Sequence, residues 1–233
     1  DKDTTAATAG GEWSVSGALA EVPDSAAPEQ VFVQTGDLVA AIEAAGLERS
    51  DDSDPFDWLI PIVGVSQDDA PSKVFVPLPE LLGSYARITE PRLQELVGIG
   101  LNDIDAFTNQ ATPPTDLTVL SGDGIGPDGL SDDLIEHDGV HSDIEGDDLA
   151  IDLAHRDETL SLLGRPTRIR AEEGAVALSS VTPALKDWRG DADTLADRTP
   201  LTAVAAGLDD HDAYSAVLTE VESGGDLGSA LLG

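Results

Sequence analysis

Apolar and polar positions alternate in short segments along the chain, and the first clear segment predicts a strand followed by a helix. Residues 30–34 (QVFVQ) alternate β-branched or aromatic residues with polar ones, a pattern typical of a strand. Residues 38–45 place apolar side chains at a helical spacing. Asp37 is the expected N-cap of this helix and Gly46 its expected C-cap.

The same periodicities assign elements to most of the remaining chain. Strands are predicted at 74–76, 116–120 and 213–221, and helices at 79–84, 90–96, 102–107, 131–136, 182–188 and 199–206. Two hairpins are predicted, one pairing 140–144 with 149–153 and the other pairing 167–170 with 175–179. The apolar segment 56–65 is expected to be buried and broken at Pro61. Hairpins mixed with helices predict an α+β fold of antiparallel sheets with helices packed on one face.

Composition shifts suggest how the chain is organised. Residues 1–11 are small and polar and read as a flexible tether, and the Pro-rich segment 111–115 (ATPPT) reads as a rigid joint. The predicted units are therefore an N-terminal subdomain at 12–111 and a C-terminal α+β subdomain at 112–233. A strand running into Gly-Asp and then towards a helix occurs three times (FVQTGDLVAAI, TVLSGDGIGPDGL, TEVESGGDLGSALL). This repeat suggests duplicated βα-type units, although Gly and Asp are also common in the turns that connect strands to helices.

Charge changes the picture more than any motif. The chain has 46 acidic and 12 basic residues, a formal net charge of -34, and the excess is spread along the whole sequence. Such a surface repels itself at low salt and is relieved by screening, so it is typical of adaptation to high salt. Compositional bias of a high-GC host is the alternative explanation. In either case nucleic acids are excluded as partners, because phosphate binding needs clustered Lys and Arg.

The absence of Cys and Met from the sequence bears on the cellular compartment and on the possible chemistry. The chain has no Cys, which excludes disulfides, thiolate metal sites and cysteine nucleophiles, and it has no Met. Residues 1–11 resemble the segment that follows a cleaved signal peptide. We therefore expect an extracytoplasmic protein, at the cell surface or secreted, in which a lipid anchor would lie on a residue preceding Asp1. No apolar run is long enough for a membrane span, so a transmembrane protein is not expected.

Clusters of aspartate make calcium the only cofactor that the sequence suggests. One loop holds Asp51, Asp52, Asp54 and Asp57, and a second holds Asp123 and Asp128. Calcium takes six to eight oxygen ligands from loops of this kind. Neither loop has the spacing of an EF-hand, and a chain rich in Asp produces such clusters by chance.

No motif predicts catalytic residues. Paired carboxylates are too frequent here to identify a glycosidase or an aspartic dyad. Residues 189–191 spell the adhesion tripeptide Arg-Gly-Asp, but the interpretation that the sequence favours is an ordinary loop that follows a helix.

Four segments resemble uncharacterised exported lipoproteins of high-GC bacteria: GLNDIDAF (100–107), PPTDLTVLSGD (113–123), IDLAH (151–155) and LADRTPLTAVAAGL (195–208). The resemblance implies an extracytoplasmic, lipid-tethered protein, and the acidity implies a salt-loving relative. It transfers no active-site residue.

These observations favour a non-catalytic surface or envelope protein that acts as a binding or assembly module on a protein partner. The first alternative is a solute- or metal-ion-binding lipoprotein, which would need a pocket with converging polar groups. The second is a hydrolase that uses carboxylates, which would need two such groups in a cleft.

Overall fold

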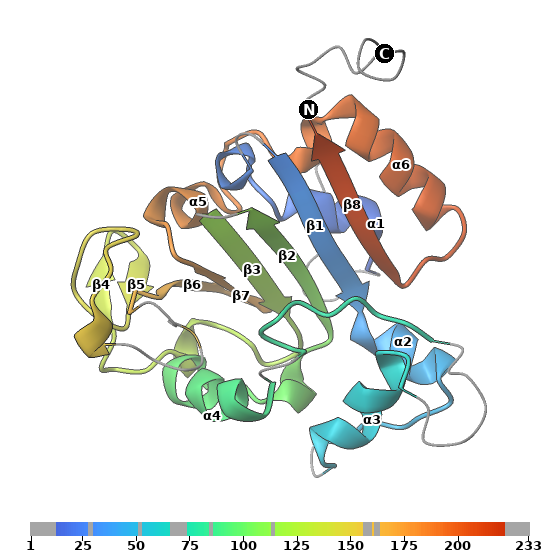
Figure 1. The fold of residues 1–233 in the computed structure, drawn as a ribbon, viewed down its shortest axis with the longest axis horizontal. Coiled ribbons are helices and arrows are strands. Elements are labelled where there is room, and N and C mark those ends of the chain that lie inside the picture. Colours follow the sequence, from blue (N-terminus) through green and yellow to red (C-terminus); the bar gives the residue numbers. More distant parts are fainter. Residues whose placement is uncertain are drawn as a thin grey trace, which may run out of the picture.

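One antiparallel sheet of eight strands runs through the molecule, in the order β4-β5-β6-β7-β3-β2-β1-β8 (Figure 1). The computed structural model describes residues 13–27, 30–50, 53–65, 74–83, 86–112, 115–155, 160 and 164–221. The strands are β1 (Gln30–Asp37), β2 (Ala106–Thr112), β3 (Thr115–Ser121), β4 (Ile135–His137), β5 (Val140–Ser142), β6 (Arg168–Glu172), β7 (Ala175–Ser179) and β8 (Ser215–Val221). The α+β class predicted from the sequence is confirmed.

Six described α-helices accompany the sheet: α1 (Val15–Ala20), α2 (Leu38–Ala44), α3 (Pro55–Ile62), α4 (Ala86–Val97), α5 (Thr182–Asp187) and α6 (Thr199–Asp209). Local chemistry explains where two of them begin. The side chain of Asp37 accepts a hydrogen bond of 2.9 Å from the backbone N–H of Ala40, so it caps α2 as predicted. Asp54 caps α3 in the same way, with Pro55 in the first turn.

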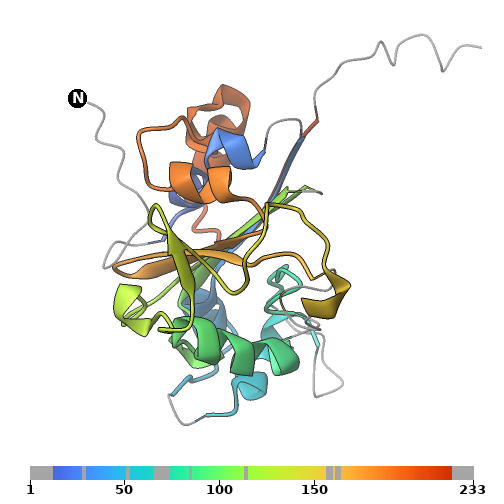
Figure 2. The same cartoon turned by 90° about the vertical axis from the view of Figure 1, so that its left-hand side faces the viewer.

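The helices lie on both faces of the sheet, which corrects the expectation of one face. Side chains alternate across each strand, so Val176 and Leu178 join one core cluster while Ala175 and Ala177 join the other. Helices α2, α3 and α4 contribute to the first cluster, and α1, α5 and α6 to the second. Figure 2 shows the two groups on opposite sides of the sheet. A strand buried on both faces needs two apolar layers, and one layer of helices cannot supply both.

Several predicted elements are confirmed. These are the strands at 30–34, 116–120 and 213–221, the hairpin of 167–170 with 175–179, and the helices at 38–45, 90–96, 182–188 and 199–206. Segment 56–65 is buried at Trp58, Leu59 and Ile62 as expected. Pro61 lies inside the last turn of α3 and does not break the helix before its end.

Other predicted elements are wrong. Residues 102–107 form one 3-10 turn (Leu101–Asp103) and then enter β2, because the Asp103 side chain closes the turn on the N–H of Gly100 and ends it. Val74 and Val76 are buried and Phe75 is exposed, as in a strand, but residues 74–76 form no strand, and the Val76 N–H donates to the carbonyl of Ile62. The segment 79–84 is a turn over residues 80–83, where the described residues end, and forms no α-helix.

The second half of the molecule contains the remaining corrections. Residues 131–136 form turns and then β4, and they do not form a helix. β5 pairs with β4 and β6, whereas residues 149–153 form no strand. The turn between β4 and β5 is Asp138-Gly139, both with positive φ, a geometry that favours a two-residue hairpin.

The sheet also bears on the proposed organisation of the chain. β2 and β3 pair on either side of the 111–115 joint, with Thr112 opposite Thr115, so the sheet includes strands from both predicted subdomains. Of the three strand–Gly–Asp segments, the first runs from β1 into α2, and the second runs from β3 into a turn and a 3-10 helix. The Gly-Asp of the third and the helix predicted after it lie outside the described residues.

Candidate functional site

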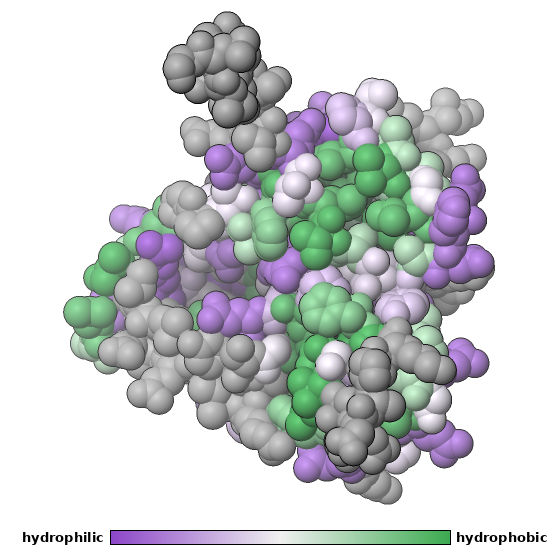
Figure 3. All heavy atoms as spheres, turned by 45° about the vertical axis from the view of Figure 1, so that its right-hand side comes forward, coloured by the Kyte–Doolittle hydropathy of each residue, from purple (hydrophilic) through white to green (hydrophobic). Residues whose placement is uncertain are grey.

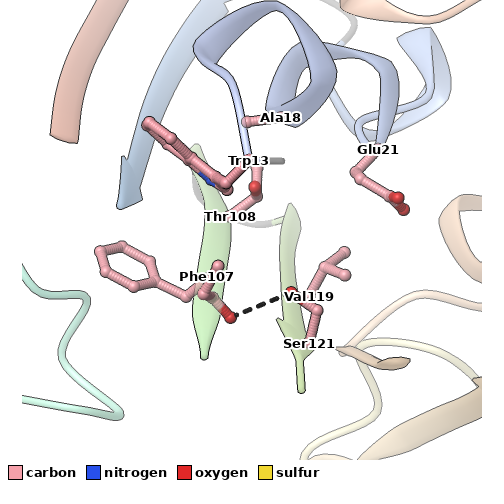
Figure 4. A pocket seen from close by; sticks show the side chains of 8 residues that line it. Trp13, Ala18, Glu21, Phe107, Thr108, Val119 and Ser121 are labelled. Atoms are coloured by element: carbon pink, nitrogen blue, oxygen red, sulfur yellow. Dashed lines mark hydrogen bonds between the residues drawn. The ribbon is translucent and has the colours of Figure 1, made fainter. Parts of the chain in front are cut away.

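A small pocket lies between α1 and the strands β2 and β3 (Figure 4). Its volume of about 10 Å³ has room for roughly one water molecule. The polar groups in its wall are already hydrogen-bonded: the Thr108 hydroxyl lies 3.1 Å from that of Thr35, and the Ser121 hydroxyl donates to the carbonyl of Ala106 at 3.3 Å. The pocket is therefore too small to bind a ligand larger than a water molecule.

The carboxylate of Glu21, also in the pocket wall, is held by the region that follows α5. It accepts from the Trp188 indole N–H at 2.7 Å and from two nitrogens of the Arg189 guanidinium at 2.8 and 3.0 Å. The guanidinium also lies 4.7 Å from the centre of the Trp188 ring, within range of a cation–π contact. Because Arg189 is committed to this pair and is 9% exposed at its side chain, the Arg-Gly-Asp tripeptide does not present its arginine to a partner.

The predicted calcium ligands are placed as follows. Asp51 and Asp52 lie outside the described residues. Asp54 caps α3 and Asp57 is exposed in its first turn, whereas Asp123 and Asp128 are exposed in the loop after β3. Across the described part of the chain, no three His, Asp or Glu side chains form a group that could hold a metal ion. Calcium binding therefore stays a prediction.

The basic side chains are largely neutralised within the fold. In the part of the chain that the structure describes, seven of them form ion pairs with carboxylates: Arg49, Arg92, Arg168, Arg170, Lys186, Arg189 and Arg198. Arg198 contacts two carboxylates at once, Asp24 at 2.9 Å and Glu220 at 3.0 Å, and these hydrogen bonds raise its pKa against the opposing effect of its burial. The acids exceed the bases by 34 in the sequence, so the charge that this protein offers to a partner is overwhelmingly negative.

One region departs from this acidity. No charged residue occurs in 30–36 of β1, in β2, in 199–208 of α6 or in 213–219, which includes most of β8. Within these segments Phe32, Val204 and Val217 are 39%, 53% and 47% exposed. Figure 3 shows hydrophobic side chains gathered on this side of the molecule, around α6, β8 and β1. We call the exposed part of these segments the uncharged surface.

Neutral polar side chains lie on the sheet beside the uncharged surface, half-buried at Gln34 and buried at Asn109 and Thr118. The Asn109 amide donates to the side-chain carbonyl of Gln34 at 3.3 Å, and the Thr118 hydroxyl donates to Asn109 at 2.8 Å. Alternation along the strands places these three residues on the same face as Phe32 and Val217. The sheet next to the exposed apolar side chains is therefore neutral, as the cores of protein interfaces tend to be.

No motif or charge cluster in the sequence marks this surface; its signal is a local lack of charged residues. The signal was present: in a chain with 46 acidic residues, stretches such as 199–208 carry none. Comparison with known proteins adds no further guide, since no family model, no curated protein and no solved structure matches the chain. Among the described helices, none is long and apolar enough to cross a membrane.

Proposed function

We propose that this protein is a non-catalytic, extracytoplasmic surface or envelope protein that acts as a binding or assembly module, and that the uncharged surface is where its protein partner binds. The observation that supports this most is the coincidence of exposed apolar side chains with the segments that lack charge. Exposed Phe32 and Val217 lie on the neighbouring strands β1 and β8, and exposed Val204 lies on α6, which packs against the other face of β8.

Desolvation explains why a binding surface would be placed there. Burying a carboxylate in an interface without a matched partner costs several kcal/mol, whereas burying an apolar side chain is favourable. The cores of protein interfaces are accordingly depleted in charged residues. In a protein with a net charge of -34, an uncharged surface is the place where a partner can bind without this penalty.

The extracytoplasmic setting is supported by the resemblance of residues 100–107, 113–123, 151–155 and 195–208 to exported lipoproteins. The acidity supports a salty medium, in which screening reduces the repulsion between this protein and its neighbours.

A pair of matched valines tests the proposal. Val217 is 47% exposed on β8 and Val39 is 46% exposed on α2, outside the uncharged surface. We expect Val217→Glu to abolish co-sedimentation of the protein with an envelope partner in extracts of its host, and Val39→Glu to leave it intact. Equal behaviour of the two variants contradicts the assignment of the surface. A calcium- or solute-dependent stabilisation in a protein that never co-sediments favours the ion- or solute-binding alternative.

A further inference from the structure

The two edges of the sheet differ in length and in charge. β4, at one edge, has three residues, and its Glu136 and His137 are exposed. Short, charged edges of this kind resist pairing with other chains. β8, at the other edge, has seven residues, and its first five are uncharged. Among the described strands β8 pairs with β1 alone, so one side of it lacks a neighbour.

Hydrogen bonds around β1 show which way its backbone groups point. The N–H of Phe32 donates to the side chain of Gln110 on β2 at 3.1 Å, so it points towards β2. The N–H of Asp37 donates to the carbonyl of Tyr214, just before β8, at 2.8 Å. Because these directions alternate along a strand, the odd-numbered residues of β1 point towards β8.

The register then gives the direction of each residue in β8. Residues 31, 33 and 35 of β1 lie opposite Glu220, Leu218 and Ala216, which therefore point their backbone groups back at β1. The residues between them, Val217 and Thr219, point their N–H and C=O groups away from the sheet. Among the described residues, no strand pairs with these outward groups of Val217 and Thr219, so the edge presents donors and acceptors next to the exposed Val217 side chain.

We infer that an extended segment of a partner protein, uncharged in its middle and carrying Lys or Arg at its ends, pairs with β8 as a ninth strand. This inference rests on the proposed binding function and specifies its partner. The middle of such a segment would lie against Val217 and Thr219, where both the backbone groups and the apolar surface are available. Strand addition of this kind takes its affinity from main-chain hydrogen bonds and its selectivity from alternate side chains.

Charge identifies the ends of that segment. Asp210 and Asp212 are exposed in the connection from α6 to β8. Glu220, near the opposite end of the strand, is already paired with Arg198 at 3.0 Å, so the attraction for Lys or Arg comes from the two aspartates and from the net charge of -34. A second copy of this chain does not match this pattern. Pairing of two β8 strands would bring together two molecules that each carry a net charge of -34 and that offer no basic residue to the exposed Asp210 and Asp212 from β8 itself.

Fluorescence anisotropy with designed peptides tests the inference on the full chain. The probe is a labelled nine-residue peptide that alternates Thr and Val between terminal Lys pairs, used up to millimolar concentration at fixed salt. We expect it to bind, and the same peptide with terminal Glu pairs to bind at least tenfold more weakly. N-methylation of the amides along one edge of the peptide should abolish binding, whereas N-methylation along the other edge should not.

Variants at Thr219 test the edge itself. Thr219→Pro removes an outward N–H and is compatible with an edge strand, while Thr219→Val keeps that group. We expect Thr219→Pro to bind the peptide roughly five- to tenfold more weakly than Thr219→Val, because only the proline variant lacks the outward N–H. Bound peptide should also slow amide exchange at Val217 and Thr219, whose N–H groups point away from β1, more than at Leu218, whose N–H points towards it.

Three results overturn the inference: no binding of the basic peptide, equal binding of the acidic one, or binding with unchanged exchange at Val217 and Thr219. A dimer that Thr219→Pro abolishes would assign the edge to a second copy and also overturn it. If the peptides fail while Val217→Glu still abolishes co-sedimentation with the envelope partner, strand pairing is wrong and the proposed function stands. If that substitution also has no effect, both are wrong.

Discussion

Removing the carboxylate of Glu21 is expected to destabilise the fold by about 3–5 kcal/mol, the range found when one member of a buried ion pair is deleted. The Glu21 and Arg189 side chains are 4% and 9% exposed, so little water can replace the lost partner. Glu21→Ala leaves the Arg189 guanidinium without its counter-charge and the Trp188 N–H without its acceptor at 2.7 Å. Both groups would then be buried with unmet hydrogen-bonding capacity.

Equilibrium unfolding in urea at one fixed high salt concentration measures the effect, with tryptophan fluorescence and circular dichroism as independent probes. The control is Glu95→Ala, which removes the carboxylate of the exposed Arg92–Glu95 pair; Glu95 is 66% exposed at its side chain. That change should cost no more than about 0.5 kcal/mol. The double variant Glu21→Leu/Arg189→Met should recover much of the loss, because an apolar pair can replace a buried ion pair. A loss for Glu21→Ala as small as that for Glu95→Ala would refute the reasoning.

Three further predictions concern charge and backbone geometry. The midpoint of thermal unfolding should rise steeply with NaCl or KCl, because screening relieves the repulsion of a chain with net charge -34; a midpoint flat in salt contradicts this. Burial raises the pKa of Asp37 above its ordinary value of 3.8, so its ionisation weakens the fold as pH rises through the raised pKa, and below 3.8 this cost is absent. Asp37→Asn keeps the cap, so by urea unfolding this variant should be more stable than the unmodified protein at neutral pH but not at pH 3. Equal stability of the two proteins at both pH values would contradict the raised pKa. A Cβ on Gly122 would lie 2.0 Å from the Asp103 carbonyl oxygen, so Gly122→Ala should lower the free energy of unfolding by about 3 kcal/mol or more. Gly207 lies on α6 with open space where a Cβ would lie, so Gly207→Ala should raise the free energy of unfolding by about 0.5–1 kcal/mol. A lower urea midpoint for Gly207→Ala than for Gly122→Ala would contradict the packing.

The sequence predicted those elements whose periodicity and end signals agree. At β1 and α2 the alternation, the cap at Asp37 and the helical spacing lead to one answer, and the structure matches it. The hairpin of β4 and β5 could also be predicted from the sequence, because Asp138-Gly139 is a strong signal for a two-residue turn. It was missed because the strands on either side have only three residues each and show little alternation.

The segment around β2 could not be assigned from its own residues. AFTNQAT lacks the β-branched, alternating pattern of a strand, and Asn102 just before it resembles a helix cap. Its strand conformation comes from its neighbours: β1 and β3 pair with it on either side, and Asn109 bonds to Gln34 and Thr118 across them. Contacts between residues far apart in sequence override local propensity here.

The same limit applies to the candidate binding surface. The lack of charge in 199–208 and 213–219 can be read from the sequence, but nothing local shows that these segments meet β1 at an edge of the sheet. The direction of the backbone at Val217 depends on pairing with residues nearly two hundred positions away, such as Gln34 opposite Val217.

Photo-crosslinking from the uncharged surface tests the central claim most directly. A photoreactive amino acid is placed at Val217 in one variant and at Val39, equally exposed, in another, and each is expressed in the native host and irradiated in intact cells. The account predicts one discrete crosslinked protein from position 217 and none from position 39, with loss of the crosslink when Phe32 is changed to Glu. Crosslinks from position 39 alone, or from neither position, would contradict the assignment of this surface as a binding site.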